Sequence, residues 1–184
     1  MGQSKRIAVF CVGNMLMLDD GLGPAVYREL RAYNLGENVD LFDVGCMSME
    51  LVGAVDTYDV IITVDAIDGT EHDAGTIFRF APEDMAQRPF GSQSLHDLKL
   101  SDLFLAASLL GYQAEGICLG MQVENASPAQ ATIGLTEPVY AKLADMVDCV
   151  LAELVHLDVP VRVRTTGELV EPGFHHTLIE QDDE

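Results

Sequence analysis

The sequence predicts an α/β fold with a mostly parallel, twisted sheet and helices on both faces. Apolar runs of strand length alternate with helical segments from residue 7 onward, in the order strand, helix, strand, helix, strand. This alternation favours right-handed crossovers between parallel strands. The run at 7–12 is also apolar throughout, as expected of a strand buried on both faces.

The first half of the chain supplies three of the expected strands. Strand 7–12 leads through a glycine-containing turn at 12–23 into a helix, and Pro24 suits the first turn of that helix. The helix fades near residues 34–36, and residues 39–44 alternate enough for a second strand. Ser48 suits the cap of a second helix, and the β-branched run 60–64 forms the third strand.

The second half predicts a fourth strand at 75–80, at an edge of the sheet, and a fifth at 117–123. Between them, residues 81–94 form a long loop, a kind that is often functional, and a helix then runs to about residue 110. Residues 124–136 are irregular, and a long helix opens at Glu137 and ends near His156. We expect one domain over 1–160 and a partly disordered C-terminal extension over 161–184.

Composition narrows the possible functions. A net charge of −20 disfavours nucleic acid and anionic membranes as partners, and it fits either solubility in a salty cytoplasm or docking to a basic surface. Neither a signal peptide nor a membrane-spanning segment is recognisable, so a cytoplasmic location is expected. The four cysteines are far apart in sequence and predict buried free thiols instead of a disulfide framework.

Three side chains are expected to converge at the carboxyl edge of the sheet. Asp20 follows the first strand, Asp65 follows the third, and His96 stands at the start of a helix. In the commonest doubly wound orders the first and third strands are neighbours, which places Asp20 and Asp65 at one crevice. Two oxygens and one nitrogen with positions left open suit a borderline divalent metal such as nickel, zinc or iron.

Other interpretations of these residues stay open. Asp19 and Asp20 could both be turn formers, and the glycines do not match the spacing of a dinucleotide-binding or Walker motif. Cys46 could be a nucleophile at a helix start. The adjacent pair at 175–176 could bind metal, although two histidines in an expected disordered tail are a weak signal.

Four stretches resemble the endopeptidases that mature the large subunit of nickel-iron hydrogenases. Residues 13–23 are similar to the opening signature of that family, and residues 43–45 followed by 49–51 resemble its second glycine turn. Residues 64–68 look like its central aspartate motif, and residues 94–98 occupy the place of its histidine motif. Residues 120–122 and 134–139 give a weaker match to its last strand and helix.

The resemblance implies a five-stranded sheet between two helical layers. It also implies an aspartic-type endopeptidase, which removes a C-terminal extension from the large-subunit precursor once nickel has been inserted. By position, Asp20, Asp65 and His96 take the nickel-contacting and catalytic roles. The nickel is supplied by the substrate, so no permanently bound cofactor is expected, and a monomer is favoured.

Three rival functions follow from the same residues. A metal- or nucleotide-binding α/β module would bind without catalysis, although the two adjacent acids would repel a phosphate. A docking chaperone would bind the large subunit without cutting it. A metallopeptidase with its own zinc would retain that metal on purification, but the sequence has no H-E-x-x-H motif.

Overall fold

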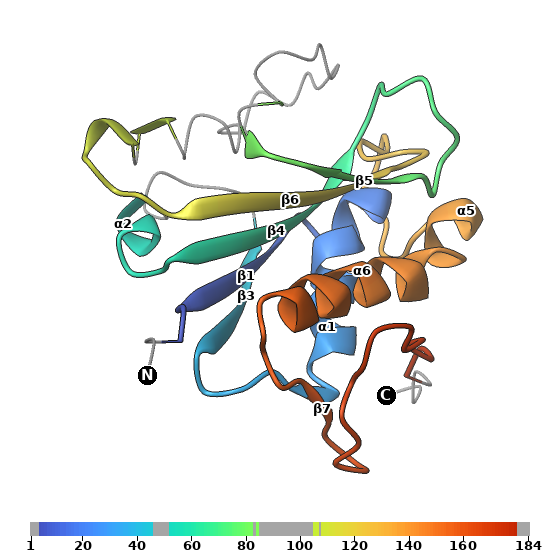
Figure 1. The fold of residues 1–184 in the computed structure, drawn as a ribbon. Coiled ribbons are helices and arrows are strands. Elements are labelled where there is room, and N and C mark those ends of the chain that lie inside the picture. Colours follow the sequence, from blue (N-terminus) through green and yellow to red (C-terminus); the bar gives the residue numbers. More distant parts are fainter. Residues whose placement is uncertain (1–3, 46–51, 83, 85–104, 107, 180–184) are drawn as a thin grey trace.

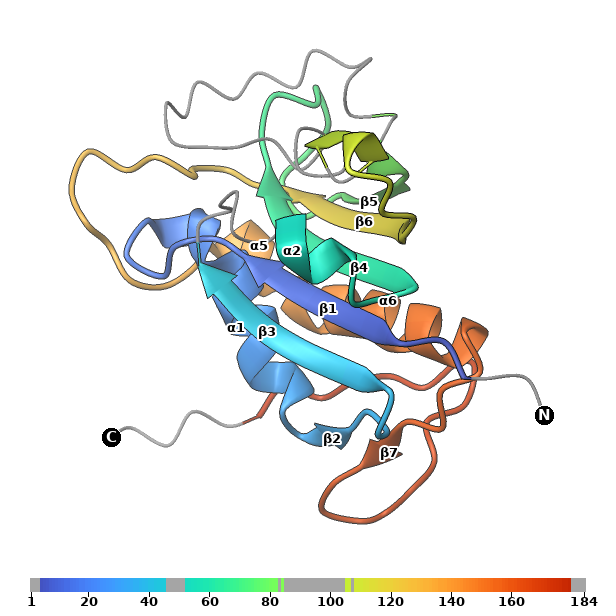
Figure 2. The same ribbon diagram turned by 90° about the vertical axis from the view of Figure 1, so that its left-hand side faces the viewer.

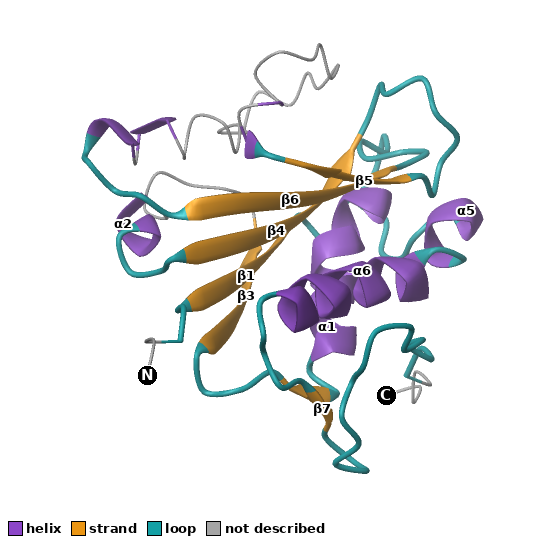
Figure 3. Ribbon diagram, viewed as in Figure 1, coloured by secondary structure: helices purple, strands orange, loops and turns teal. Residues whose placement is uncertain are grey.

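The computed structural model describes residues 4–45, 52–82, 84, 105–106 and 108–179 of the 184-residue chain. Within these residues the chain forms a five-stranded sheet with helices against it (Figures 1 and 3). None of the helices in the described part of the chain has the length and hydropathy required to cross a membrane.

The sheet has the strand order β3-β1-β4-β6-β5. Its strands are β1 Ile7–Val12, β3 Val39–Gly45, β4 Val60–Ile67, β5 Ile77–Phe80 and β6 Glu115–Gln122. All neighbouring pairs are parallel except β5 and β6, which are antiparallel. This confirms the mostly parallel sheet, the contact between the first and third expected strands, and the edge position of strand 75–80.

Helices cover both faces of the sheet (Figures 1 and 2). One face packs against α1 Leu22–Leu30 and α6 Leu143–His156, with the short α5 Glu137–Tyr140 preceding α6. The other face packs against α2 Val52–Val55 and against Ala106, in the helical residues before Gly111. The three-layer α/β fold predicted from the sequence is therefore confirmed.

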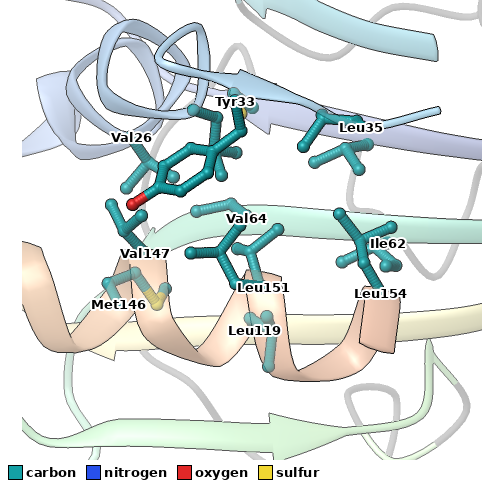
Figure 4. Packing of buried hydrophobic residues seen from close by; sticks show 14 of the residues in the cluster. Val26, Tyr33, Leu35, Ile62, Val64, Leu119, Met146, Val147, Leu151 and Leu154 are labelled. Atoms are coloured by element: carbon teal, nitrogen blue, oxygen red, sulfur yellow. The ribbon is translucent and has the colours of Figure 1, made fainter. Parts of the chain in front are cut away.

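The larger of the two cores lies between α1, α6 and the sheet. Alternate residues of the central strands point into it, and the apolar side of α6 packs over them (Figure 4). Ile62 and Val64 of β4 are fully buried there, as are Met146 and Leu154 of α6. The near-continuous apolar character of β1 and β4 arises because the intervening residues pack into the second core on the opposite face.

Several elements differ from the sequence prediction. The expected helix 137–156 is divided at Ala141 and Lys142, and Lys142 leaves helical geometry with φ −108° and ψ 4°. The division lies where the Lys142 side chain packs against Gly75, so closely that a Cβ on Gly75 would lie 2.8 Å from its Cγ. The proposed cap Ser48 and the start of the helix after residue 94 lie outside the described residues.

The segment after Pro160 is packed against the domain over residues 161–179. β7 Arg162–Val163 pairs with β2 Tyr33–Asn34 in a separate two-stranded antiparallel sheet. Val161 and Val170 are buried, and the backbone then returns across α1 and α6. Residues 161–179 thus lie against the domain, whereas residues 180–184, to which the expected disorder also applies, lie outside the described residues.

A buried polar cluster fastens this segment to α1. The His176 imidazole lies with Nε2 2.7 Å from the Glu29 carboxylate and Nδ1 2.6 Å from the Tyr33 hydroxyl, and its main-chain N–H donates to Asp148. Because a carboxylate accepts, the Nε2 N–H donates to Glu29, while Nδ1 lies within hydrogen-bonding distance of the Tyr33 hydroxyl. Burial, and then the charges of Asp148 and Glu29, raise the pKa of Tyr33 to about 12.

Candidate functional site

The candidate site lies where β1 gives way to α1 through residues 13–21. The Gly13 N–H donates to the carbonyl of Gly45 at 2.9 Å, which joins the end of β1 to the end of the edge strand β3. The Asn14 N–H donates to both the carbonyl and the carboxylate of Asp20, at 3.1 and 2.8 Å. These bonds close residues 14–20 into a compact loop that ends in a 3-10 helix, η1 Leu18–Gly21.

Two glycines are required by the close packing of this loop. Gly13 has φ +135°, and a Cβ there would lie 1.9 Å from the carbonyl oxygen of Asp20. A Cβ on Gly23 would lie 1.9 Å from the carbonyl oxygen of Val12, so α1 approaches β1 with no room for a side chain. Strand, turn and helix packing therefore accounts for both glycines without a bound phosphate.

The two adjacent acids of the loop have different environments. Asp19 is fully buried, and its carboxylate accepts four hydrogen bonds from residues 124–136. The donors are the main-chain N–H groups of Glu124, Asn125 and Thr136 and the Thr136 hydroxyl, at 2.6–3.2 Å. The interpretation of Asp19 as a turn former was thus incomplete, because its carboxylate also binds the loop 124–136, which is distant in sequence.

Asp20 and Asp65 are brought to the same edge of the sheet. Asp20 is half-buried in η1, which packs against β4, and Asp65 is half-buried within β4 itself. β1 and β4 pair in parallel up to Cys11 and Val64; Asp65 follows Val64 directly, and Asp20 lies in the turn after β1. The structure thus places both carboxylates at the carboxyl ends of adjacent parallel strands, the usual ligand-binding edge of such sheets.

The strand next to Asp65 carries a glycine beside it. The strand continues past the expected end at residue 64, so Asp65 pairs with Gly120 of β6. A Cβ on Gly120 would lie 3.0 Å from Ile67 and 3.2 Å from Phe80, which leaves little room for any other residue there. The packing of Ile67 and Phe80 therefore accounts for the glycine at this position.

Two of the candidate residues lie outside the described residues, namely His96 and Cys46. Within the described residues no cluster of three or more His, Cys, Asp or Glu side chains is arranged to hold a metal ion. The metal-contacting roles of Asp20, Asp65 and His96 therefore stay a prediction.

Two of the described cysteines are poor nucleophiles. Cys11, Cys118 and Cys149 are free thiols, as expected from their spacing. Burial, and secondarily the Asp43 carboxylate, raises the pKa of the Cys11 thiol far above its usual range. Burial, together with neighbouring acids, also raises the pKa of Cys149. Since the thiolate is the reactive form, these two groups are unsuited to nucleophilic catalysis.

The histidine pair at 175–176 has a structural role. His176 is buried between Glu29 and Tyr33, and His175 is exposed with Nδ1 3.2 Å from the Asp148 carboxylate. Both nitrogens of the His176 ring are within hydrogen-bonding distance of protein atoms, which leaves neither for a metal.

Sequence reasoning missed the loop 124–136 as part of the site. The sequence signal for a contact with this loop was Asp19, the residue next to Asp20. An acid buried inside an apolar turn needs hydrogen-bond donors from another part of the chain. The donors are mostly main-chain N–H groups, which carry no identifiable pattern in a sequence. The Asp19 contacts and the backbone bonds Leu18 N–H to Thr132 O and Thr132 N–H to Leu16 O place this loop beside the acids.

Comparison with known proteins identifies the family. The model of the hydrogenase maturation proteases matches residues 24–153. The hydrogenase expression/formation protein HupD of Rhizobium leguminosarum bv. viciae is 30% identical over 183 residues, which cover 95% of this chain and 87% of the relative. The hydrogenase 2 maturation protease of Escherichia coli (strain K12) is 32% identical over 151 residues, which cover 81% and 90%.

The fold agrees with this assignment. The hydrogenase maturating endopeptidase HybD from E. coli is similar to this chain with a TM-score of 0.76 and 30% identity, over 85% of this chain and 96% of that one. A solution structure of an endopeptidase from E. coli gives a TM-score of 0.78 at 30% identity, over 88% and 99%. The chain therefore belongs to the hydrogenase maturation proteases and is a peptidase.

Proposed function

We propose that this peptidase removes the C-terminal extension of a nickel-iron hydrogenase large-subunit precursor after nickel has been inserted. The observation that carries the proposal is the position of Asp20 and Asp65, half-buried at the carboxyl ends of adjacent parallel strands. The names of its relatives, a hydrogenase 2 maturation protease among them, agree with such a substrate.

Substrate recognition in this proposal uses the nickel ion that the precursor brings. Asp20 and Asp65 offer carboxylate oxygens and His96 offers an imidazole nitrogen, a donor set suited to a borderline divalent metal. These side chains complete the coordination of the ion and bring the neighbouring peptide bond to the edge of the sheet. An empty precursor lacks this anchor and is left uncut.

Hydrolysis needs a water molecule activated for attack on the scissile carbonyl and a proton for the departing amine. The same acids lie where the peptide bond is brought, so one of them can hold the attacking water and pass its proton to the leaving nitrogen. Nickel next to the bond can also polarise its carbonyl. The proteolytic step is thereby restricted to a substrate that already holds its metal.

The proposal includes the partner, the compartment and the assembly. The partner is the large-subunit precursor, and the enzyme retains no metal of its own between turnovers. We place the reaction in the cytoplasm, where thiols stay reduced, which agrees with the free state of the three described cysteines. The enzyme acts as a monomer.

A cleavage assay tests the proposal. Nickel-loaded and nickel-free precursor are incubated with the wild type and with the variants Asp20→Asn, Asp65→Asn and His96→Ala, and mass spectrometry detects loss of the extension. The variant Asp73→Asn is the matched control, since Asp73 is an exposed acid of the segment after β4. Metal analysis of the purified enzyme accompanies the assay.

We expect the wild type and the control to trim only the nickel-loaded precursor, and the three site variants to lose about 10²-fold or more in rate. Binding without trimming by the wild type would instead indicate a docking chaperone. Equal trimming of nickel-free precursor would refute nickel recognition. One zinc per chain, required for activity, would replace the proposal with a self-contained metallopeptidase.

A further inference from the structure

A groove with a volume of 470 Å³ lies beside the loop that carries Asp20. Its walls come from the start of that loop, the outer side of α1, residues 133–135 and α5, and it includes Gly21, the residue directly after Asp20. This volume is within the range of about 300–1,000 Å³ that is typical of ligand-binding sites. The groove is therefore large enough for several side chains and begins next to a proposed metal-contacting acid.

Large apolar side chains line the groove and are exposed to solvent. Met15 is 53% exposed, Ile133 71% and Tyr140 46%, and the half-buried Leu135 also lines the groove. Leu16, next to the groove, is 48% exposed. Contiguous exposure of this kind on a soluble chain is characteristic of a surface that another molecule covers.

The charge of the groove differs from that of the whole chain. Although the chain has a net charge of −20, the charged residues among those that line the groove in the described structure are one cation, Arg28, and one anion, Asp43. Arg28 is exposed and forms no ion pair or hydrogen bond with any residue that the structure describes. The groove thus offers an unused cation in an apolar setting, which suits a carboxylate flanked by apolar side chains.

The groove is built before any ligand arrives. Its outer wall, residues 133–135, belongs to the loop that the buried Asp19 carboxylate holds through Thr136. Backbone bonds between Leu18 and Thr132 at 2.7 Å, and between Thr132 and Leu16 at 2.8 Å, join this wall to the loop of the acids. A fixed groove reduces the ordering cost of binding.

We propose that this groove docks an apolar segment of the large-subunit precursor that carries an acidic group opposite Arg28. The proposal rests on the proposed function, because it assigns the groove to the same substrate. Gly21 connects the groove to Asp20, so a segment bound there enters the site from the side of α1. Apolar contacts supply the affinity for this segment, and its acidic group, bound by Arg28, fixes its position along the groove.

Steady-state trimming of the nickel-loaded precursor tests the assignment with two groove variants, Ile133→Asn and Arg28→Glu. The matched controls are Leu109→Asn, since Leu109 is 81% exposed and belongs to the helical residues of the other face, and Arg31→Glu, since Arg31 is an exposed arginine at the end of α1. Circular dichroism and thermal melting establish that each variant is folded.

We expect each groove variant to raise KM by about tenfold, the size of effect found for interface anchors, with kcat within about twofold of the wild type. The controls should keep KM within about twofold. Unchanged KM in both groove variants, an equal rise in the controls, or a loss confined to kcat would each overturn the assignment. If the wild type neither binds nor trims the precursor, the proposed function itself fails, and the groove assignment with it.

Discussion

Replacing Asp19 by asparagine should destabilise the protein strongly while changing its volume little. The carboxylate is fully buried, with three donors on Oδ2 and the Thr136 N–H on Oδ1. An asparagine has only one oxygen, so its amide N–H groups would face at least one of these donors. Losing one charge-assisted bond and leaving a buried donor unpaired costs about 2–4 kcal/mol.

Chemical denaturation measures this loss as a change in the free energy of unfolding. For a chain of this size the expected loss corresponds to a fall in Tm of roughly 5–15 °C. The matched control is Asp145→Asn, which removes an exposed ion pair with Lys142 and should leave the free energy of unfolding nearly unchanged. Amide hydrogen exchange gives the second measurement, and the N–H groups of Asn125 and Thr136 should exchange faster in Asp19→Asn.

A loss no larger than that of the control, with unchanged exchange at both amides, would refute the reasoning. It would mean that the loop 124–136 is held by its other contacts and that Asp19 is dispensable for the groove. A large loss of stability without faster exchange at these amides would contradict the mechanism in another way, because the cost would then arise elsewhere.

Three further predictions concern other parts of the fold. His176→Ala should cost about 2–4 kcal/mol in a denaturation experiment because it leaves buried polar groups unpaired, whereas His175→Ala, at an exposed side chain, should cost under about 0.5 kcal/mol. The folded protein raises the pKa of Tyr33 to about 12, so the stability that the neutral Tyr33 hydroxyl contributes is complete below pH 10 and is lost as the pH rises through 12. The Tm of the wild type should therefore fall more steeply over this pH interval than the Tm of Tyr33→Phe. Gly23→Ala should lower the yield of folded protein severely, since its Cβ would lie 1.9 Å from the Val12 carbonyl oxygen, and near-native Tm would show that α1 can move away from β1.

The central fold was predictable because its signals are local and redundant. β1 and β4 are apolar along their whole lengths, and the alternation of strands with helices restricts the topology to parallel pairs. The division between α5 and α6 was not predictable, and it coincides with the packing of Lys142 against Gly75. That contact joins residues far apart in sequence, and helical periodicity alone gives no indication of it.

The candidate site was predictable to the extent that topology determines it. Asp20 follows β1 and Asp65 lies near the carboxyl end of β4, two strands that the sequence identifies, and parallel strands bring their carboxyl ends to one edge. The role of Asp19 was hidden because its partners are main-chain groups of residues 124–136. The burial of His176 was not predictable either, since it depends on Glu29 and Tyr33, which are more than 140 residues away in the sequence.

The contact between His176 and Glu29 joins residues 147 positions apart, and this separation affects the order in which the protein matures. During synthesis α1 is complete long before residue 176 leaves the ribosome, so the Glu29 carboxylate must stay hydrated until the late segment docks. The face of the domain formed by α1 and α6 therefore closes after all strands of the sheet have been made. A nascent chain that already contains the whole sheet is expected to be less stable than the released protein, and more dependent on chaperones until that segment arrives.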